Sequence, residues 1–536
     1  SHCLVGSEMC IRDRPTTPSR LRPRAVFIGL LLAVGICVLT PFNNAFRQAT
    51  PLGGGHFPLA PFFIFFWLSL IMAGSGRLFK RPPWLNGKEL LLIWILMVLV
   101  SGIAYTGLVR TFFINLTAPF HFATPENQWT EILTPLLPAN WCPRSQEAVT
   151  ALYEGLPGGR RLGWGAVLQA IPWAVWVPSL LSWGLFVALC YFVMICLVNL
   201  LSQQWLRNER MNFPLLRVPL LMEEAYSQGT FGQFLLNRFM LVGLLIPVTL
   251  HLLNGLNFYF PGVPQIPTLF LTGTYFPKYG LFSGFYKIKV YIFPAFIGLA
   301  FLTTRQISFS FWIFFLLGGL LFGFLAVMGY NIPAAALGIT FGPTLSRPEE
   351  MQMIGAYGVF FIFLIWLARY HLMDVSRQAL GLAPAPTSSS AWFSTRLAAW
   401  GFLGGSVMLV IWLHLLGAGW WVAGLVVGAF LMIMLVSSRI ITQGGLAYFT
   451  LTAAPLDGVI ALFGPGIFSA GGIFIAGIIQ KALFLDLRES LMPSLVHASR
   501  ITEKIKQRRL MITAISIALL LGVVVSFTAM LALCYK

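Results

Sequence analysis

One carboxylate, Asp457, falls inside a strongly apolar stretch, with glycine and proline residues on both sides of it. An acid at bilayer depth costs about 2.5–3.5 kcal/mol on insertion scales, so it usually faces protein or water and often marks a pathway. Gly444 and Gly445 precede this acid, and a Gly464-Pro465-Gly466 break follows it. Such breaks let backbone polar groups line a cavity within the membrane. The pattern predicts a substrate or ion pathway in a broken or re-entrant hairpin over residues 440–481.

Other polar residues are candidates for the same pathway. Arg439 and Gln443 lie just before the acid's apolar stretch and could bind the acid, an ion or an anionic substrate. His251, Asn254 and Asn257 cluster at the end of another apolar segment. An intramembrane histidine is a candidate proton carrier, although a hydrogen-bonded packing role is more common. The alternative for the hairpin is an ordinary pair of spanning helices, with the acid near the membrane surface.

Signatures of soluble catalysis and of metal binding are missing from the sequence. It contains no HExxH, GxSxG, P-loop or dinucleotide-binding fingerprint. Without a P-loop, the chain is not expected to be the ATPase of a pump. The seven cysteines show no CxxC spacing, and the seven histidines do not pair at i, i+4. We therefore expect no metal, no cofactor and no enzymatic activity.

The elements that must position these residues are membrane-spanning helices. The chain is 57% hydrophobic and 10% charged, with a mean hydropathy of +0.80, whereas a soluble domain carries about 25% charged residues. We predict an all-α, polytopic integral membrane protein with about 11–13 transmembrane helices. The net charge of +18 arises from basic residues at the ends of apolar runs, so nucleic-acid binding is not expected. Arginines before the first run predict a cytoplasmic N-terminus in a bacterial inner membrane.

The chain is expected to contain two membrane domains. Residues 1–14 resemble translated sequencing adapter and are set aside. Residues 15–372 are predicted to form about eight spans, with a large, ordered outer loop over residues 110–165. Residues 373–395 are rich in proline and serine, which is typical of a linker. Residues 396–536 form the C-terminal membrane domain with the broken hairpin.

Four stretches carry a resemblance to a known group of proteins. They are ATPENQW at Ala123–Trp129, NERMNFPLLRVPL at Asn208–Leu220, LLNGLNFYFPGVPQIP at Leu252–Pro267 and SRIITQGGLAYF at Ser438–Phe449. Together they resemble a family of uncharacterised bacterial polytopic membrane proteins that is oligopeptide-transporter-like (OPT-like). The resemblance implies a permease for a small solute such as a peptide or a metal chelate. Some members of that family have an acid where this chain has Gln443, so proton or metal coupling at this position is not carried over.

These observations together predict a secondary transporter that is coupled to an ion gradient and works by alternating access. Its partners would be the lipid bilayer and a small-molecule substrate, with a homo-oligomer as one possible assembly. One alternative is a membrane enzyme that acts on a lipid or a lipid-linked sugar through the outer loop 110–165. Another is a non-catalytic membrane assembly partner, which predicts no continuous polar cavity.

Overall fold

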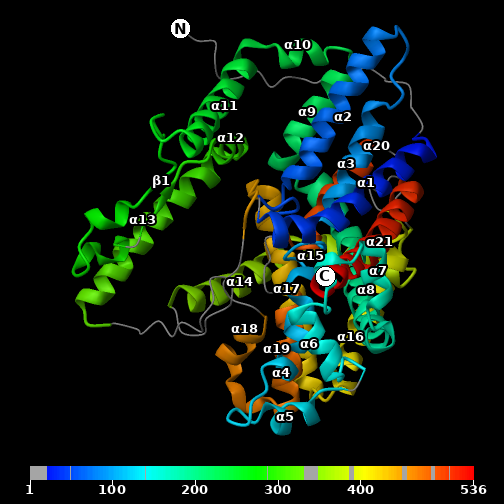
Figure 1. Cartoon of the computed structure of the whole chain (residues 1–536), viewed down its shortest axis with the longest axis vertical. Coiled ribbons are helices and arrows are strands. Elements are labelled where there is room, and N and C mark those ends of the chain that lie inside the picture. Colours follow the sequence, from blue (N-terminus) through cyan, green and yellow to red (C-terminus); the bar gives the residue numbers. More distant parts are fainter. Residues whose placement is uncertain are drawn as a thin grey trace.

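Helices make up nearly all of the regular structure. The computed structural model describes residues 21–48, 50–138, 140–286, 288–330, 348–384, 392–449, 455–483, 489–505 and 507–536. Within these ranges, strands occur only as β1 (Leu269–Phe270) and β2 (Val290–Tyr291), which pair antiparallel. The predicted all-α fold class is confirmed (Figure 1).

Eight helices in the described ranges are long and apolar enough to cross a membrane, since about 20 apolar residues span a hydrocarbon core of about 30 Å. These spans contain α1 (Pro23–Phe42), α2 (Leu59–Leu78), α8 (Trp173–Gln203), α11 (Arg238–Tyr259), α13 (Arg305–Val327), α16 (Thr395–Leu415), α17 (Trp420–Gly444) and α21 (Arg508–Tyr535). A ninth is formed if α14 (Pro348–Leu367) and α15 (Arg369–Ala379), which meet at a 63° bend, count as one span. The chain is therefore a polytopic membrane protein.

Shorter helices connect or interrupt these spans. They are too short to be counted as full spans. Several of them correspond to apolar segments that belong to the predicted 11–13 transmembrane helices. They are α3 (Gly87–Ser101), α4 (Val109–His121), α5 (Trp129–Ile132), α6 (Gln146–Glu154), α7 (Trp164–Ala170), α9 (Pro214–Ser227), α10 (Phe231–Leu235), α12 (Pro294–Leu302), α18 (Pro455–Phe463), α19 (Ala470–Leu483) and α20 (Leu491–Ile505). The Gly464-Pro465-Gly466 break separates α18 from α19, as the broken hairpin requires.

The centre of the bundle is α3, a helix that is apolar on every side. Residues 90–101 are all buried, which is the pattern of a helix surrounded by other helices. It packs against α1, α2, α9, α20 and α21. A capping box starts this helix, because Asn86 accepts a hydrogen bond from the Glu89 amide while the Glu89 carboxylate accepts one from the Asn86 amide.

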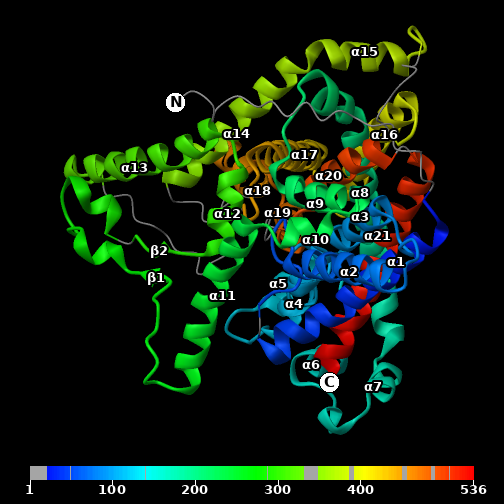
Figure 2. The same ribbon diagram turned by 90° about the horizontal axis from the view of Figure 1, so that it is seen from above.

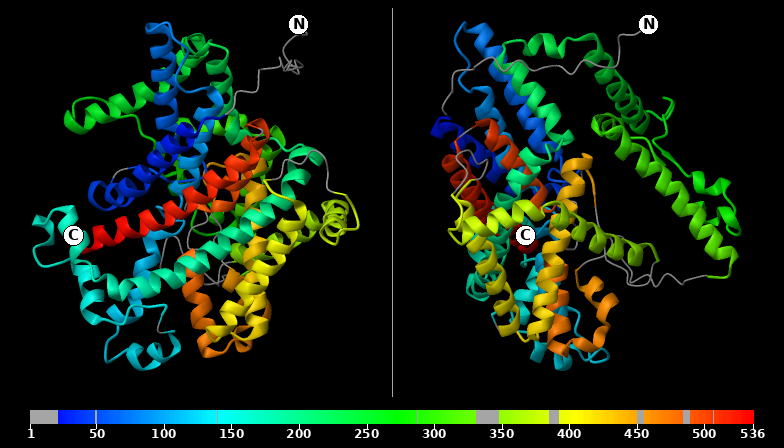
Figure 3. Two further views of the ribbon diagram at one scale, coloured as in Figure 1. Left: turned by 90° about the vertical axis from the view of Figure 1, so that its right-hand side faces the viewer. Right: turned by 180° about the vertical axis from the view of Figure 1, so that it is seen from behind.

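The two predicted membrane domains pack closely against each other. Helix α8 lies along α16, and α1 lies along α21, so each contact joins an N-terminal helix to a C-terminal one (Figure 3). The predicted linker begins inside α15, which continues to Ala379, and its residues 385–391 lie outside the described residues. These contacts build one continuous core from both ends of the chain.

A hairpin-like arm formed by α11, α12 and α13 projects from this bundle (Figures 1 and 2). None of the residues of α11 is buried, and within α13 only Gly323 is buried. The base of the arm is α12, which packs against α9. The arm is therefore apolar but almost entirely without protein neighbours in the described part of the chain.

The predicted outer loop 110–165 is folded into helices α4 to α6 and the start of α7. The C-terminal end of α21 holds this region in place. The Trp176 indole donates a hydrogen bond to the Tyr535 hydroxyl at 2.8 Å, and that hydroxyl donates to the Ala148 carbonyl at 2.8 Å. The Leu156 amide donates to the Tyr535 carbonyl at 2.9 Å. These hydrogen bonds attach the region to the C-terminal end of α21.

Candidate functional site

Two pairs of helices are interrupted where they pass through the core. Helix α3 ends at Ser101 and α4 begins at Val109, while α19 ends at Leu483 and α20 begins at Leu491. Helix α3 packs against α20 and α4 packs against α19, and Glu489, a described residue of the second interruption, lies against Gly102 at the end of α3. The described residues Ser101, Glu489 and Ser490 are buried, where the backbone groups that an interrupted helix leaves free need partners.

Glycine allows the two interruptions to come into contact. A Cβ atom on Gly102 would lie 2.5 Å from the Glu489 carbonyl oxygen, and one on Gly107 would lie 2.8 Å from the same atom. Both distances are shorter than any real Cβ contact. A larger residue at either position would push the segment before α20 away from the end of α3.

A third chain segment enters the same place from the loop between α1 and α2. The Gly55 amide donates a hydrogen bond to a carboxylate oxygen of Glu489 at 2.9 Å. The His56 amide donates to the Ala447 carbonyl at 2.7 Å, and Ala447 belongs to the fourth segment, which follows α17. Gly55 has φ +81°, a left-handed conformation that favours glycine. Four segments that are distant in sequence therefore meet at one point.

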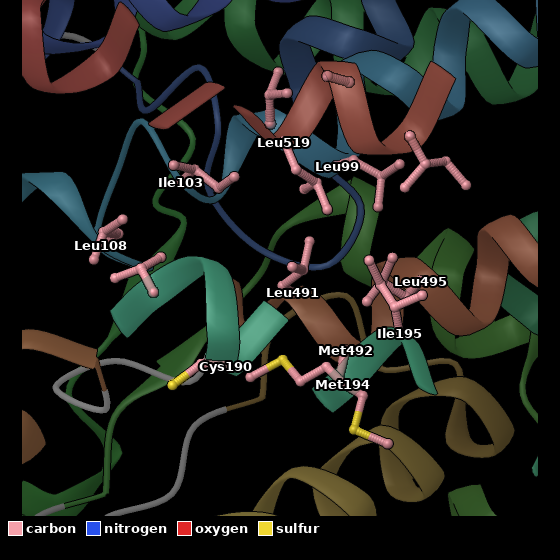
Figure 4. Packing of buried hydrophobic residues seen from close by; sticks show 14 of the residues in the cluster. Leu99, Ile103, Leu108, Cys190, Met194, Ile195, Leu491, Met492, Leu495 and Leu519 are labelled. Carbon is pink, nitrogen blue, oxygen red and sulfur yellow. The ribbon is translucent and has the colours of Figure 1, made fainter. Parts of the chain in front are cut away.

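The first three of these segments, together with α8 and α17, line a small cavity with both polar and apolar walls, which we call the break cavity. Its volume is about 30 Å³, and a buried water needs at least roughly 10–15 Å³, so it has room for one or two waters or a small ion. Its polar lining includes His56, Ser101, Glu489, Ser490 and Ser494. Apolar side chains from α3, α8 and α20 also line it, among them Leu99, Met194 and Leu491, which Figure 4 shows within the buried hydrophobic cluster.

Two helix ends of opposite polarity face the break cavity. The carbonyl end of α3 carries partial negative charge at Ser101 and Gly102, and the amide end of α20 carries partial positive charge at Leu491. Glu489 adds a carboxylate of which only 6% is exposed. Burying an ionised carboxylate is costly unless hydrogen bonds or an opposite charge compensate it. The cavity thus presents groups for a cation on one side and for an anion on the other.

Two polar side chains of the break cavity are poorly satisfied within the described residues, although the His56 ring approaches the Phe449 backbone. Neither ring nitrogen of His56 makes a well-formed hydrogen bond, and neither does the Ser490 hydroxyl. Burial, together with the neighbouring His497, lowers the pKa of the His56 imidazole to about 3, so this ring is neutral at pH 7. Buried polar groups without partners are rare in proteins, and a bound ion, water or polar ligand would satisfy them.

The structure brings two of the sequence-predicted site residues together, Arg439 and Gln443. Arg439 donates from Nε to Gln443 Oε1 at 2.8 Å and forms an ion pair with Glu209. Glu209 also accepts a hydrogen bond from Gln204 at 2.8 Å. This buried network joins the end of α17 to the end of α8. The partner of Arg439 is therefore Glu209, a residue of the turn after α8.

The predicted glycines lie beside the break cavity. Gly444 ends α17, and Gly445 caps it in the left-handed conformation at φ +69°. The chain then runs directly to Ala447 and Tyr448. A Cβ atom built on Gly55 would lie 3.0 Å from the Tyr448 ring. These glycines thus direct the segment after α17 toward the site without lining it.

The remaining predicted residues lie elsewhere. Asp457 belongs to α18, and its side chain is outside the described residues. His251 is exposed on α11 in the arm. Asn254 exchanges two hydrogen bonds with the backbone of Ile266, at 2.9 and 2.8 Å, and Asn257 donates to the Val263 carbonyl at 2.6 Å. Both asparagines therefore shape the loop after α11.

Sequence reasoning missed the residues that line the break cavity. The charged residues from Asp486 to Arg509 give this segment the sequence pattern of an amphipathic helix at the inner membrane surface. In the structure, however, Leu491–Ser499 are all buried and α20 packs against α3, α8 and α17. The signals that could have revealed the site are the three glycines before His56 and the paired glycines at positions 102 and 107. Glycines in such groups often mark close backbone approach.

The fold and the break cavity define a polytopic helical membrane protein with two interrupted helix pairs at its centre. Comparison with protein-family models assigns the chain to a particular family. Residues 15–536 match the family of unknown function DUF6785, and the chain belongs to that family. No curated protein matches the chain.

Proposed function

We propose that the protein is a secondary transporter that moves a small polar solute and is coupled to an ion gradient. The observation that carries this proposal is the meeting of two interrupted helix pairs at a buried polar cavity. Substrate and coupling-ion sites of secondary transporters are typically formed by discontinuous helices at their interface. The bacterial inner membrane, with a cytoplasmic N-terminus, is the proposed location, following the distribution of basic residues.

In this proposal Glu489 and the carbonyl end of α3 bind the coupling cation. The amide end of α20 and the Ser490 hydroxyl bind an anionic group of the solute, as helix N-termini do elsewhere. A cavity of about 30 Å³ is too small for a peptide or a chelate. The solute therefore enters only when the helices around the cavity separate, as alternating access requires. The OPT-like resemblance favours a peptide or a metal chelate as the solute.

The alternatives have weaker support. The enzyme hypothesis depends on carboxylates of the outer loop 110–165, such as Glu126 and Glu131. None of these carboxylates lines the break cavity or the larger apolar cavity between α8 and α16. The assembly-partner hypothesis predicts no continuous polar cavity, and the interrupted helices beside the break cavity are the feature that favours transport over it.

Uptake into proteoliposomes tests the proposal. The probes are radiolabelled dipeptides and iron and nickel chelates, offered with an inward proton or sodium gradient. We expect gradient-driven uptake of at least one probe, and a loss of more than tenfold in the Glu489→Gln variant. The control is Glu131→Gln, which changes an exposed acid of α5 and should leave uptake unchanged.

Two results would contradict the proposal. If wild-type protein accumulates none of the probes above protein-free liposomes, the transport function is not supported for these solute classes. If Glu489→Gln takes up a probe at the wild-type rate, the break cavity is not the coupling site.

A further inference from the structure

A second cavity, larger and apolar, lies between α8 and the helices α14 to α17. We call it the apolar groove. Its volume is about 580 Å³, within the range of about 300–1,000 Å³ that small-molecule sites occupy. Its walls include Leu200, Phe361, Leu372, Leu403 and Leu431. A ligand of matching chemistry would be a hydrocarbon chain.

The few polar atoms in the walls of the apolar groove already have partners. The Ser376 hydroxyl donates to the Leu372 carbonyl at 2.9 Å. The Trp400 indole donates to the Ala379 carbonyl at 3.2 Å. A peptide or sugar placed here would lose its hydrogen bonds to water and gain none, which is unfavourable. The occupant is therefore apolar where it lies inside the groove.

The position of α15 places the apolar groove near a membrane surface. This helix bends 63° from α14 and packs against α16. Val375 and Ala379 are buried on one face, while Asp374 and Arg377 are exposed. A helix with one apolar and one charged face is typical of the membrane interface. The groove thus lies among spanning helices with its α15 side at the headgroup level.

Three arginines lie within three residues in sequence of the groove-lining residues Leu372, Ser376 and Ala399, with one acid, Asp374, among them. We call Arg369, Arg377 and Arg396 the basic rim. Arg369 and Arg377 belong to α15, and Arg396 lies in the first turn of α16, just before the groove-lining Trp400. The Arg369 guanidinium stacks over the Trp366 ring at 4.2 Å, which holds it at the start of α15. Clusters of arginine at the membrane surface attract anionic headgroups.

We propose that the apolar groove holds an acyl chain of an anionic phospholipid, with its phosphate at the basic rim. The walls supply only apolar contacts, the rim supplies positive charge, and the surrounding spans give direct access from the bilayer. This proposal does not depend on the transport function, since the groove and the break cavity share no lining residue.

A pair of glycine variants tests occupancy of the apolar groove. Gly428 lines the groove, and an added Cβ would meet nothing within 4 Å, so Gly428→Leu places a branched side chain in the groove and narrows it. Gly424 lies one turn away on α17 with equally open space but does not line the groove, so Gly424→Leu is the matched control. Each protein is reconstituted with equal phosphatidylglycerol and phosphatidylethanolamine and extracted in detergent. Retained lipid is then counted by native mass spectrometry.

We expect wild type and Gly424→Leu to retain phosphatidylglycerol, and Gly428→Leu to retain at least fivefold less. The Arg369→Gln, Arg396→Gln double variant should keep a lipid but lose the preference for phosphatidylglycerol. The control for charge is Arg238→Gln at the start of α11. Equal retention by Gly428→Leu and wild type, or no preference for the anionic lipid in wild type, would overturn the proposal.

A crosslinking experiment on wild-type protein tests the same proposal without depending on whether a variant folds. Phosphatidylglycerol with a diazirine in its acyl chain is photolysed in the reconstituted vesicles. Its adducts should concentrate on peptides that contain Leu200, Leu403 or Leu431. Adducts spread evenly over the exposed faces of α11 and α13 instead would show a general lipid coat and would refute a specific site.

Discussion

At the scale of single residues, Arg439, near the end of α17, makes several side-chain contacts at once. Besides the Glu209 ion pair and the Gln443 hydrogen bond, its Nη1 donates to the Met211 sulfur at 2.9 Å, and its guanidinium lies 5.7 Å from the centre of the Trp205 ring. Only 7% of the side chain is exposed. A charge this buried needs every one of these partners, so Arg439 acts here as a structural link between α17 and the turn after α8.

We predict that breaking this link is costly. Arg439→Met leaves the Glu209 carboxylate without its partner, and Glu209→Gln leaves the Arg439 guanidinium without its partner. Each single variant should therefore lose about 3–5 kcal/mol of unfolding free energy. The double variant should lose much less than the sum, because both charges are then removed. Denaturant unfolding in detergent micelles measures these differences.

The matched control is the pair of Arg500 and Glu503, whose side chains are 44% and 26% exposed. An exposed pair contributes about 0–1 kcal/mol, so Arg500→Gln should change stability little. If the Arg439 and Glu209 effects simply add, the two side chains are not coupled and the network described above is wrong.

At the scale of elements, the turn after α17 depends on Gly445. Its φ is +69°, and an added Cβ would lie 2.6 Å from the Pro214 Cβ. Gly158, just before the 3-10 turn Gly159–Arg161, has the same left-handed conformation at φ +72° but open space around it. Alanine substitutions at these two glycines therefore distinguish the cost of backbone strain from the cost of a steric contact.

We predict that Gly158→Ala costs about 1–2 kcal/mol, the usual cost of a left-handed non-glycine residue. Gly445→Ala should cost more, because α9 must also shift away from the new methyl group. The midpoint of thermal unfolding in micelles measures both variants. Equal destabilisation by the two variants would show that the Pro214 contact is not tight.

The long spans could be predicted from the sequence, whereas the interrupted helices could not. Helices α2 and α17 are long apolar runs. Such a run in a bilayer must form a helix, because only a helix satisfies all of its backbone hydrogen bonds internally. Helix α20 alternates polar and apolar residues, and this pattern suggested a water-facing surface. Its polar residues Ser494, His497 and Thr502 are instead buried against other protein segments. Periodicity shows that a polar face exists but not what it faces.

At the scale of the whole molecule, the break cavity is assembled from segments at both ends of the chain. Gly55 and His56 come from the N-terminal part, and Glu489 comes from the C-terminal part. Glu489 follows Asp486 and Arg488 in sequence and therefore resembled a solvated charge cluster. Asp457 drew attention because its neighbours in sequence are apolar. Local composition cannot identify a carboxylate that becomes buried only through contacts between distant segments.

The central claim is that polar solutes or ions reach the break cavity from water. Cysteine accessibility tests it without knowledge of the substrate. All native cysteines are replaced, and Ser490→Cys is compared with Ser526→Cys, which lies on α21 with 0% exposure and does not line the cavity. Reconstituted protein is treated with a small cationic methanethiosulfonate. The account predicts that Cys at position 490 is modified at least tenfold faster than Cys at position 526. Equal protection of both positions would mean a dry, closed core and would contradict the claim.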